Sequence, residues 1–316
     1  MVPRAAVEPG RSLIRCSIRF VAALTLALAA AGAAQAASLR YCDRQARLTA
    51  DQQDTLFRFA GIAKRELEQS GQAMALAARS GLDLSLFGLR YSHAGISLQA
   101  SPNGPWSVRQ LYYACDEQRP RIFDQGATGF LIGTDKPDIG YLSLVFLPAE
   151  AAARLEQAAL SNPQSLQLLA ADYSANAYPF GLRYQNCNQW VMELLATAWG
   201  GLPLADDGES PRARAQRWLQ DQGYAPTEFG LAPPLMWLSA LVPWLHRDDH
   251  PADDLARGAY RVSMPASIEA FVRARWPEAQ RVELCHAGRR VVVHRGWAPI
   301  AEGCEPGEGD EVVALD

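Results

Sequence analysis

Apolar residues recur at helical spacing near residue 55, at Leu56, Phe59, Ile62 and Ala63. A repeat of three and four residues gathers apolar side chains on one face of a helix. We therefore predict a helix over residues 51–80, which Gly81 ends.

The hydrophobic period changes to two after Phe87. Apolar and polar or small residues alternate from His93 to Leu98, a turn sequence occupies 101–105, and Trp106 begins a second alternating run to Tyr113. This pattern predicts two antiparallel strands. Weaker patterns predict further strands around 121–123, 129–133 and 141–147.

Helical spacing returns in the second half of the chain. Pro148 precedes a predicted helix over 149–160, and a second runs from Cys187 to Trp199, where Gly200 and Gly201 end it. Shorter helices are predicted near 213–222, 234–245 and 267–276, and a hairpin over 281–297. Because strands and helices come in blocks without a βαβ rhythm, the pattern predicts an α+β fold.

The first 36 residues have the composition of a secretory signal peptide. Four arginines precede an apolar run from Phe20 to Ala31, and the segment ends in Ala34-Gln35-Ala36. A membrane span needs about 20 apolar residues, so we expect cleavage and not an anchor. No later stretch predicts a transmembrane anchor, and the expected location is periplasmic or secreted.

The charge of the chain argues against a nucleic-acid partner. Its formal net charge is −4, and loss of the four arginines and Glu8 with the signal peptide makes it −7. Nucleic-acid binding uses a basic surface, which this composition does not favour.

Two segments combine reactive residues with suitable local structure. His93 lies on a predicted strand beside Gly95, and Cys187 begins an amphipathic helix. The free N–H groups of a helix N-terminus stabilise a thiolate and an oxyanion, and a facing histidine can move the proton. Taken singly, a buried cysteine is more often a small core residue and a strand histidine a structural group.

The sequences YSHAGI at 91–96 and NCNQWVMELL at 186–195 resemble the circularly permuted branch of the NlpC-type papain-fold enzymes, whose relatives include lecithin retinol acyltransferase. The resemblance covers roughly residues 85–200. It implies a permuted papain-like core, an antiparallel sheet packed on a cysteine-bearing helix, with Cys187 as nucleophile and His93 as base. Over most of its mature length the chain also resembles a family of exported bacterial proteins of unknown function.

The resemblance also implies a third polar group that orients the histidine. The strand at 106–113 has no Asp or Glu, unlike the commoner pattern. A neutral amide can serve in papain-like sites, so Gln110 is the first candidate and Tyr112 the second. Tyr184, three residues before Cys187, is a candidate oxyanion donor.

The patterns and the resemblance together suggest three regions: a signal peptide at 1–36, a permuted papain-like domain, as the resemblance implies, at 37–205, and a C-terminal α/β extension at 206–316. We expect an exported thiol hydrolase or acyltransferase that acts on an amide or ester bond, and the resemblance implies a cell-wall peptide or a lipid-linked acyl group as its substrate. The alternative is a non-catalytic envelope binding or structural protein with a degenerate papain-like site. The absence of a C-x-x-C sequence disfavours a thiol redox protein, and no cofactor is expected.

His246 and His250 have the i, i+4 spacing of two metal ligands on one helix face. Pro251 and four neighbouring aspartates favour an exposed acidic loop instead, so we predict no metal site.

Five cysteines remain after signal cleavage, so at least one is unpaired in an oxidising compartment. Cys285 and Cys304 flank the predicted hairpin and its trailing loop, where a local disulfide forms easily. A disulfide between Cys42 and Cys115 would leave Cys187 free, as a nucleophile requires. The alternative is that Cys42 and Cys115 are unpaired core residues.

Overall fold

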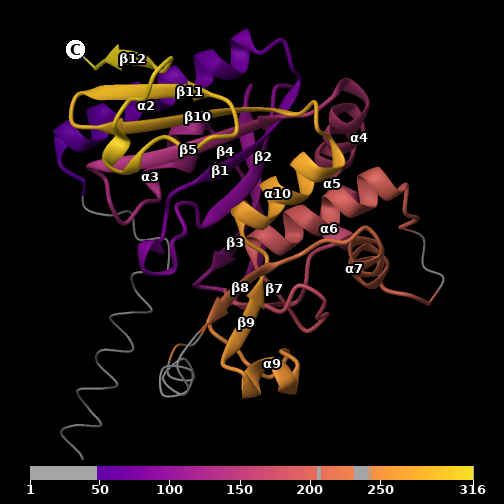
Figure 1. Ribbon diagram of the computed structural model, residues 1–316. Helices are drawn as coiled ribbons and strands as arrows, with labels where there is room; N and C mark the ends of the chain where they lie inside the picture. The colour runs from indigo at the N-terminus through magenta and orange to yellow at the C-terminus, as the bar shows by residue number, and fades with distance from the viewer. Residues whose placement is uncertain (1–47, 205–207, 231–241, 243, 316) are drawn as a thin grey trace, which may run out of the picture.

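An eight-stranded antiparallel sheet forms the centre of the molecule (Figure 1). The structure is a computed structural model that describes residues 48–204, 208–230, 242 and 244–315. The strand order is β12-β11-β10-β5-β1-β2-β3-β4. The strands are β1 (Met74–Arg79), β2 (His93–Leu98), β3 (Ser107–Ala114), β4 (Arg119–Gln125), β5 (Ile139–Phe146), β10 (Gln280–Ala287), β11 (Arg290–Arg295) and β12 (Glu311–Ala314).

Helices cover both faces of this sheet. On one face α2 (Ala50–Gln69) and α3 (Ala127–Ile132) bury their apolar residues against Ala75 and Ala77 of β1. On the other face α4 (Ala149–Leu160), α6 (Cys187–Gly200) and α10 (Pro265–Arg275) pack against Leu76 and Ala78. The sheet is therefore the middle layer of a three-layer α+β fold.

Smaller elements complete the described chain. They are the helices α5 (Asn162–Gln167), α7 (Pro211–Asp221) and α9 (Ala252–Ala256), the 3₁₀ turns η1 (Ser85–Phe87) and η2 (Glu302–Cys304), the parallel pair β6 (Asp172–Tyr173) and β7 (Tyr184–Gln185), and the antiparallel pair β8 (Thr227–Gly230) and β9 (Ala259–Val262).

The predicted helix over 51–80 is wrong in its last third. The helix ends at Gln69, and the alanine-rich residues Met74–Arg79 form β1. β1 lies between β2 and β5, and all six of its residues are buried. A strand covered on both faces has no apolar alternation, so its sequence cannot be distinguished from a helix by period.

Most of the other predicted elements are confirmed, and one strand is corrected. The helices over 149–160 and from Cys187, the antiparallel strands β2 and β3, and the hairpin β10–β11 are confirmed. The predicted strand at 129–133 is wrong, because residues 127–132 form the short helix α3 with Phe130 and Leu131 buried. The helix predicted near 234–245 falls mainly outside the described residues.

The C-terminal residues contribute to the main sheet. β10 pairs with β5 along eight residues, from Gln280 opposite Phe146 to Ala287 opposite Ile139. In Figure 1 the yellow strands β10–β12 continue the sheet beyond β5. The residues after 206 therefore share one sheet with the predicted papain-like region. No helix in the described part of the chain has the length and apolarity needed to cross a membrane.

The cysteines follow the predicted pairing where the structure describes them. Cys285 and Cys304 form a disulfide. Cys115 is disulfide-bonded as well, and its predicted partner Cys42 lies outside the described residues. Cys187 is the free cysteine of the described chain, and it is buried.

Candidate active site

His93 is the first residue of β2, where a glycine two residues later allows the next strand to approach closely. A Cβ atom at Gly95 would lie 2.6 Å from Val108 Cγ1 and 2.8 Å from the Arg109 carbonyl oxygen on β3. The missing side chain therefore brings β3, and with it Gln110, close to His93.

Gln110 is the residue that contacts the His93 ring. His93 Nε2 and Gln110 Oε1 are 2.5 Å apart, and Gln110 Nε2 donates to Gln125 Oε1 on β4 at 2.6 Å. Gln110 is fully buried, and this second bond orients its amide with the oxygen toward the imidazole. Neutral His93 then carries its proton on Nε2, which leaves Nδ1 as the basic nitrogen.

Tyr112, the second candidate, lies on the same strand but further from the imidazole. Its ring centroid is 6.0 Å from that of His93, and its side chain lines the cavity described below. Gln125 orients the Gln110 side chain by accepting its hydrogen bond. Sequence reasoning did not identify Gln125, because it considered an acidic or amide residue only on the strand at 106–113.

Cys187 begins α6 because Asn186 caps the helix. Asn186 Oδ1 accepts a hydrogen bond from the Gln189 backbone N–H at 2.7 Å. The amide nitrogen of Asn186 donates to the carbonyl oxygens of Ala175 and Ser263. These contacts fix the helix N-terminus between two loops, and the Cys187 side chain is only 7 % exposed.

One cavity of about 560 Å³ brings Cys187 and His93 together. Most of its wall is apolar or aromatic, including Leu111, Tyr173 and Trp244. Cavities of this size hold small-molecule ligands in many proteins. The cavity lies at one edge of the sheet, beside the last residue of β1 (Arg79), the first residue of β2 (His93) and residues 111–113 near the end of β3.

His93 and Cys187 approach this cavity from opposite faces. Alternation along β2 places Ala94 and Ile96 against the α6 layer, and His93 on the face that carries Phe130 of α3, 5.9 Å away between ring centroids. No hydrogen bond among the described residues joins the Cys187 thiol to the imidazole. Catalytic contacts often tighten only when substrate is bound, so a proton transfer here requires the two side chains to move closer.

Burial keeps both reactive groups neutral in the resting site. It raises the pKa of the Cys187 thiol to about 11, although hydrogen bonds from the backbone at Asn188 and Ala94 oppose this rise. Burial and, to a smaller extent, the positive charge of Arg79 together lower the pKa of His93 to about 3. Near neutral pH the site therefore holds a thiol and an uncharged imidazole.

Arg79 is the charged residue of the site that sequence reasoning missed, because it lies in the segment predicted as helix. It is the last residue of β1 and pairs in register with His93. Its side chain is 6 % exposed and lines the cavity. Its Nη1 donates to the Gly133 carbonyl oxygen, and its guanidinium lies 5.3 Å from the centroid of the Phe130 ring.

Tyr184, the candidate oxyanion donor, lies away from the cavity. Its hydroxyl donates to Asp248 at 3.4 Å, and its ring stacks on His246 with centroids 4.2 Å apart. Tyr184 does not line the cavity that contains Cys187. We therefore do not retain it as an oxyanion candidate, and the backbone N–H groups at the start of α6 are better placed.

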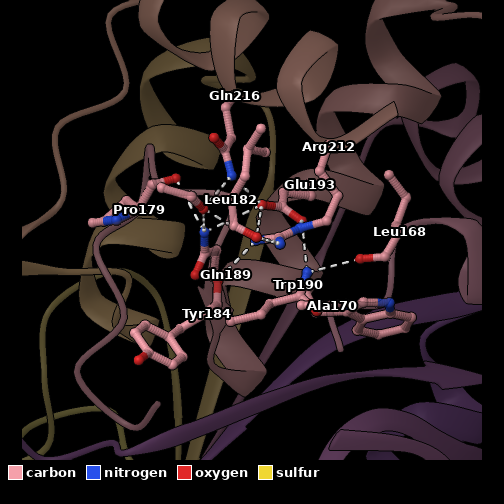
Figure 2. A network of polar contacts seen from close by, with 12 residues as sticks. Leu168, Ala170, Pro179, Leu182, Tyr184, Gln189, Trp190, Glu193, Arg212 and Gln216 are labelled. Atoms are coloured by element: carbon pink, nitrogen blue, oxygen red, sulfur yellow. Dashed lines mark hydrogen bonds and ion pairs between the residues drawn. The ribbon is translucent and has the colours of Figure 1, made fainter. Parts of the chain in front are cut away.

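A buried polar network surrounds Gln189 and Glu193 of α6 (Figure 2). Glu193 is fully buried and accepts from Arg212 of α7 at 2.8 Å and from Gln216 at 2.7 Å. Gln189, one turn earlier, donates to Glu193 and to carbonyl oxygens of residues 178, 179 and 181. The network thus ties the cysteine helix to α7 and to the loop that precedes β7.

His246 and His250 have separate partners. The His246 ring stacks on Tyr184, whereas His250 Nε2 contacts the Asn176 carbonyl oxygen at 2.7 Å. Within the described residues, no group of three or more His, Cys, Asp or Glu side chains is arranged to hold a metal ion.

The comparisons with known proteins identify a family and no function. No curated protein and no solved structure matches the chain. A family model matches residues 66–272, a span that includes Arg79, His93, Gln110 and Cys187. The chain therefore belongs to the bacterial family described as "Uncharacterized protein conserved in bacteria (DUF2145)".

Proposed function

We propose that this protein is an exported thiol hydrolase or acyltransferase in which Cys187 attacks the carbonyl of an amide or ester. The observation that carries the proposal is the single cavity lined by both Cys187 and His93, with His93 held by Gln110 at 2.5 Å. A nucleophile, a base and an orienting group are the three parts that such a reaction needs.

The reaction begins with transfer of the thiol proton to Nδ1 of His93. The sulfur forms a bond to the carbonyl carbon, and the carbonyl electron pair moves to the oxygen, which the N–H groups at the start of α6 stabilise. Collapse of this intermediate expels the leaving group, which takes the proton from His93. Water or an acceptor hydroxyl or amine then attacks the thioester carbonyl, and its proton passes through His93 to the sulfur, so that the C–S bond breaks, the acylated product leaves and the thiol is regenerated.

The sequence resemblance supports this mechanism and the fold that it uses. In permuted NlpC-type enzymes the histidine strand precedes the cysteine helix, and β2 and α6 follow that order here. We propose that the sheet and α6 correspond to a permuted papain-like core. The Cys285–Cys304 disulfide is compatible with export to an oxidising compartment.

The substrate belongs to the cell envelope, as a peptide or as a lipid-linked acyl group. The apolar wall of the cavity suits an uncharged group on at least one side of the bond that is cleaved. This preference applies equally to an acyl chain and to an apolar peptide side chain.

An acylating activity-based probe tests the proposal. The probe is a fluorophore-tagged ester with an alkoxide leaving group, which departs only when it is protonated. We expect label on Cys187 alone, and loss of label in Cys187→Ala and His93→Asn. His246→Asn is the matched control, because that imidazole stacks on Tyr184 outside the cavity. Absence of label in the folded wild type would overturn the proposal.

The second candidate function is a non-catalytic envelope binding protein. Two observations favour it: His93 and Cys187 lie on opposite faces of the sheet, and both are neutral at rest. A binding protein would keep the apolar cavity without acylation, so an unlabelled wild type that still binds the intact ester supports this alternative.

A further inference from the structure

The position of Arg79 relative to the reactive residues is set by strand pairing. Arg79 and His93 are direct partners in the antiparallel pair β1–β2. Side chains of such partners lie on the same face, with Cβ atoms about 5 Å apart. Arg79 also lines the cavity that contains Cys187. A buried positive charge therefore lies beside His93, in the wall of the cavity that Cys187 also lines.

Two glycines make room for the guanidinium and fix its place. A Cβ atom at Gly81 would overlap Arg79 Nη1, and one at Gly133 would lie 2.8 Å from Nη2. The Gly133 carbonyl oxygen accepts from Nη1, and the Phe130 ring packs near the guanidinium. Because these groups come from two loops and from α3, the charge is held at one position.

The first turn of α6 is tied to the same place. Ser92 Oγ accepts from the backbone N–H groups of Gly81 and Leu82, and the Asn188 amide donates to the Ser92 carbonyl oxygen at 3.2 Å. Asn188 directly follows Cys187. The segment between β1 and β2 thus connects the Arg79 guanidinium to the start of the cysteine helix.

The charge of Arg79 lowers the pKa of both reactive groups, which favours the charged form of the thiol and the neutral form of the imidazole. His93 is a poor counter-charge for a resting Cys187 thiolate, because the neighbouring Arg79 disfavours the imidazolium. Arg79 itself is always charged, because arginine does not deprotonate in proteins.

The other titratable groups around Cys187 are uncharged or have partners of their own. In the cavity wall Asp135 accepts from the Asp83 backbone N–H, and Tyr112, Tyr113, Tyr173 and Tyr260 are phenols. From α10, Glu269 contacts Arg281 at 3.4 Å. Among the described residues that line this cavity, Arg79 is the one arginine or lysine.

We infer that Arg79 is the counter-charge of the Cys187 thiolate, so that in the absence of substrate the thiol can lose its proton to solvent while His93 remains neutral. This inference rests on the proposed function and deepens it. His93 then carries a second proton only during its transfer from the thiol to the leaving group. The site differs in this respect from a resting thiolate–imidazolium pair, which would need a direct contact between the two side chains.

Alkylation of Cys187 by iodoacetamide tests the inference, because it requires a thiolate but no proton transfer to a leaving group. The rate is measured from pH 6 to pH 10 by peptide mass spectrometry. We expect Arg79→Met to alkylate about tenfold more slowly or worse at pH 8, equivalent to one pKa unit. Arg79→Lys keeps the charge and should recover most of the rate, whereas His93→Asn should stay within about twofold of wild type.

A measurement on the wild type covers the case in which the Arg79 variants do not fold. Nitrogen-15 NMR of labelled histidine should report a neutral His93 ring throughout the pH range in which alkylation accelerates. A charged ring in that range, or a large rate loss in His93→Asn with none in Arg79→Met, would overturn the inference. Failure of the proposed function looks different: Cys187 is then alkylated with this pattern, but the ester probe does not acylate it.

Discussion

At the scale of single residues, the site depends on how Gln110 holds one imidazole. The contact at 2.5 Å and the bond from Gln110 to Gln125 define which ring nitrogen is basic. An orienting residue acts through the histidine, so its loss lowers the reaction rate without removing the nucleophile.

We predict that Gln110→Leu lowers the rate of Cys187 acylation at least about tenfold, which corresponds to 1.4 kcal/mol in the activation free energy. Gln110→Glu keeps an acceptor oxygen and should retain more activity, with a pH profile shifted to higher pH because the carboxylate stabilises the imidazolium. Tyr112→Phe is the control and should react as wild type does. The orienting role moves to Tyr112 if its variant is the slow one.

A second residue-scale prediction concerns His286 on β10, which is fully buried against Phe59 and Gly140. Burial lowers its pKa from 6.5 to about 4. The fold thus favours the neutral ring, and the free energy of unfolding decreases as the pH falls from about 6.5 to about 4.

His286→Leu should therefore lose less stability than wild type between pH 7.5 and pH 4.5, as measured by urea unfolding. His93 also titrates with a lowered pKa, so only part of the acid sensitivity should disappear. Identical losses in wild type and variant would show that His286 does not charge on unfolding in this range.

At the scale of elements, the sequence predicts those helices whose ends carry local sequence signals. α4 has the predicted bounds, and α6 begins at Cys187, as predicted, because Pro148, Asn186 and Gly201 mark their ends. β1 was not predictable because both its faces are buried, and Arg79 was overlooked with it. The Glu193–Arg212 pair was also missed, because its partners come from two helices and neither residue has a local signal.

That pair gives an element-scale prediction about the cysteine helix. Arg212→Met leaves the fully buried Glu193 without its cation, and breaking such a pair costs about 3–5 kcal/mol in the free energy of unfolding. The double variant Glu193→Met with Arg212→Met should recover part of the loss. Arg154→Met, which removes an exposed pair with Glu150, should cost less than about 1 kcal/mol. Urea unfolding measures these free energies. Equal losses of unfolding free energy in Arg212→Met and Arg154→Met would refute the structural role of the Glu193–Arg212 pair.

At the scale of the whole molecule, one sheet unites regions that the sequence suggested as a core and an extension. β10 pairs with β5, and the Cys285–Cys304 disulfide joins β10 to η2, which follows the β10–β11 hairpin. The α+β class was accessible from the grouping of strands and helices, but the joining of β10 to β5 was not. That contact spans about half of the chain and has no local signal in either strand.

The disulfide offers a whole-molecule prediction. It joins two cysteines that are 19 residues apart in the sequence. Closing a loop of this length stabilises the fold by about 3 kcal/mol on the chain-entropy model. The double variant Cys285→Ala with Cys304→Ala should unfold at a correspondingly lower urea concentration, whereas Cys187→Ala should change stability less. A double variant as stable as wild type would contradict the entropic account.

The central claim is that Cys187 forms a covalent acyl intermediate with the help of His93. Intact-protein mass spectrometry after acid quenching measures this most directly, with an ester whose leaving group is an alkoxide. The account predicts a mass increase equal to the acyl group, located on Cys187 and removed by hydroxylamine. The increase should be absent in His93→Asn. An unmodified wild-type protein, or acylation at another residue, would contradict the account.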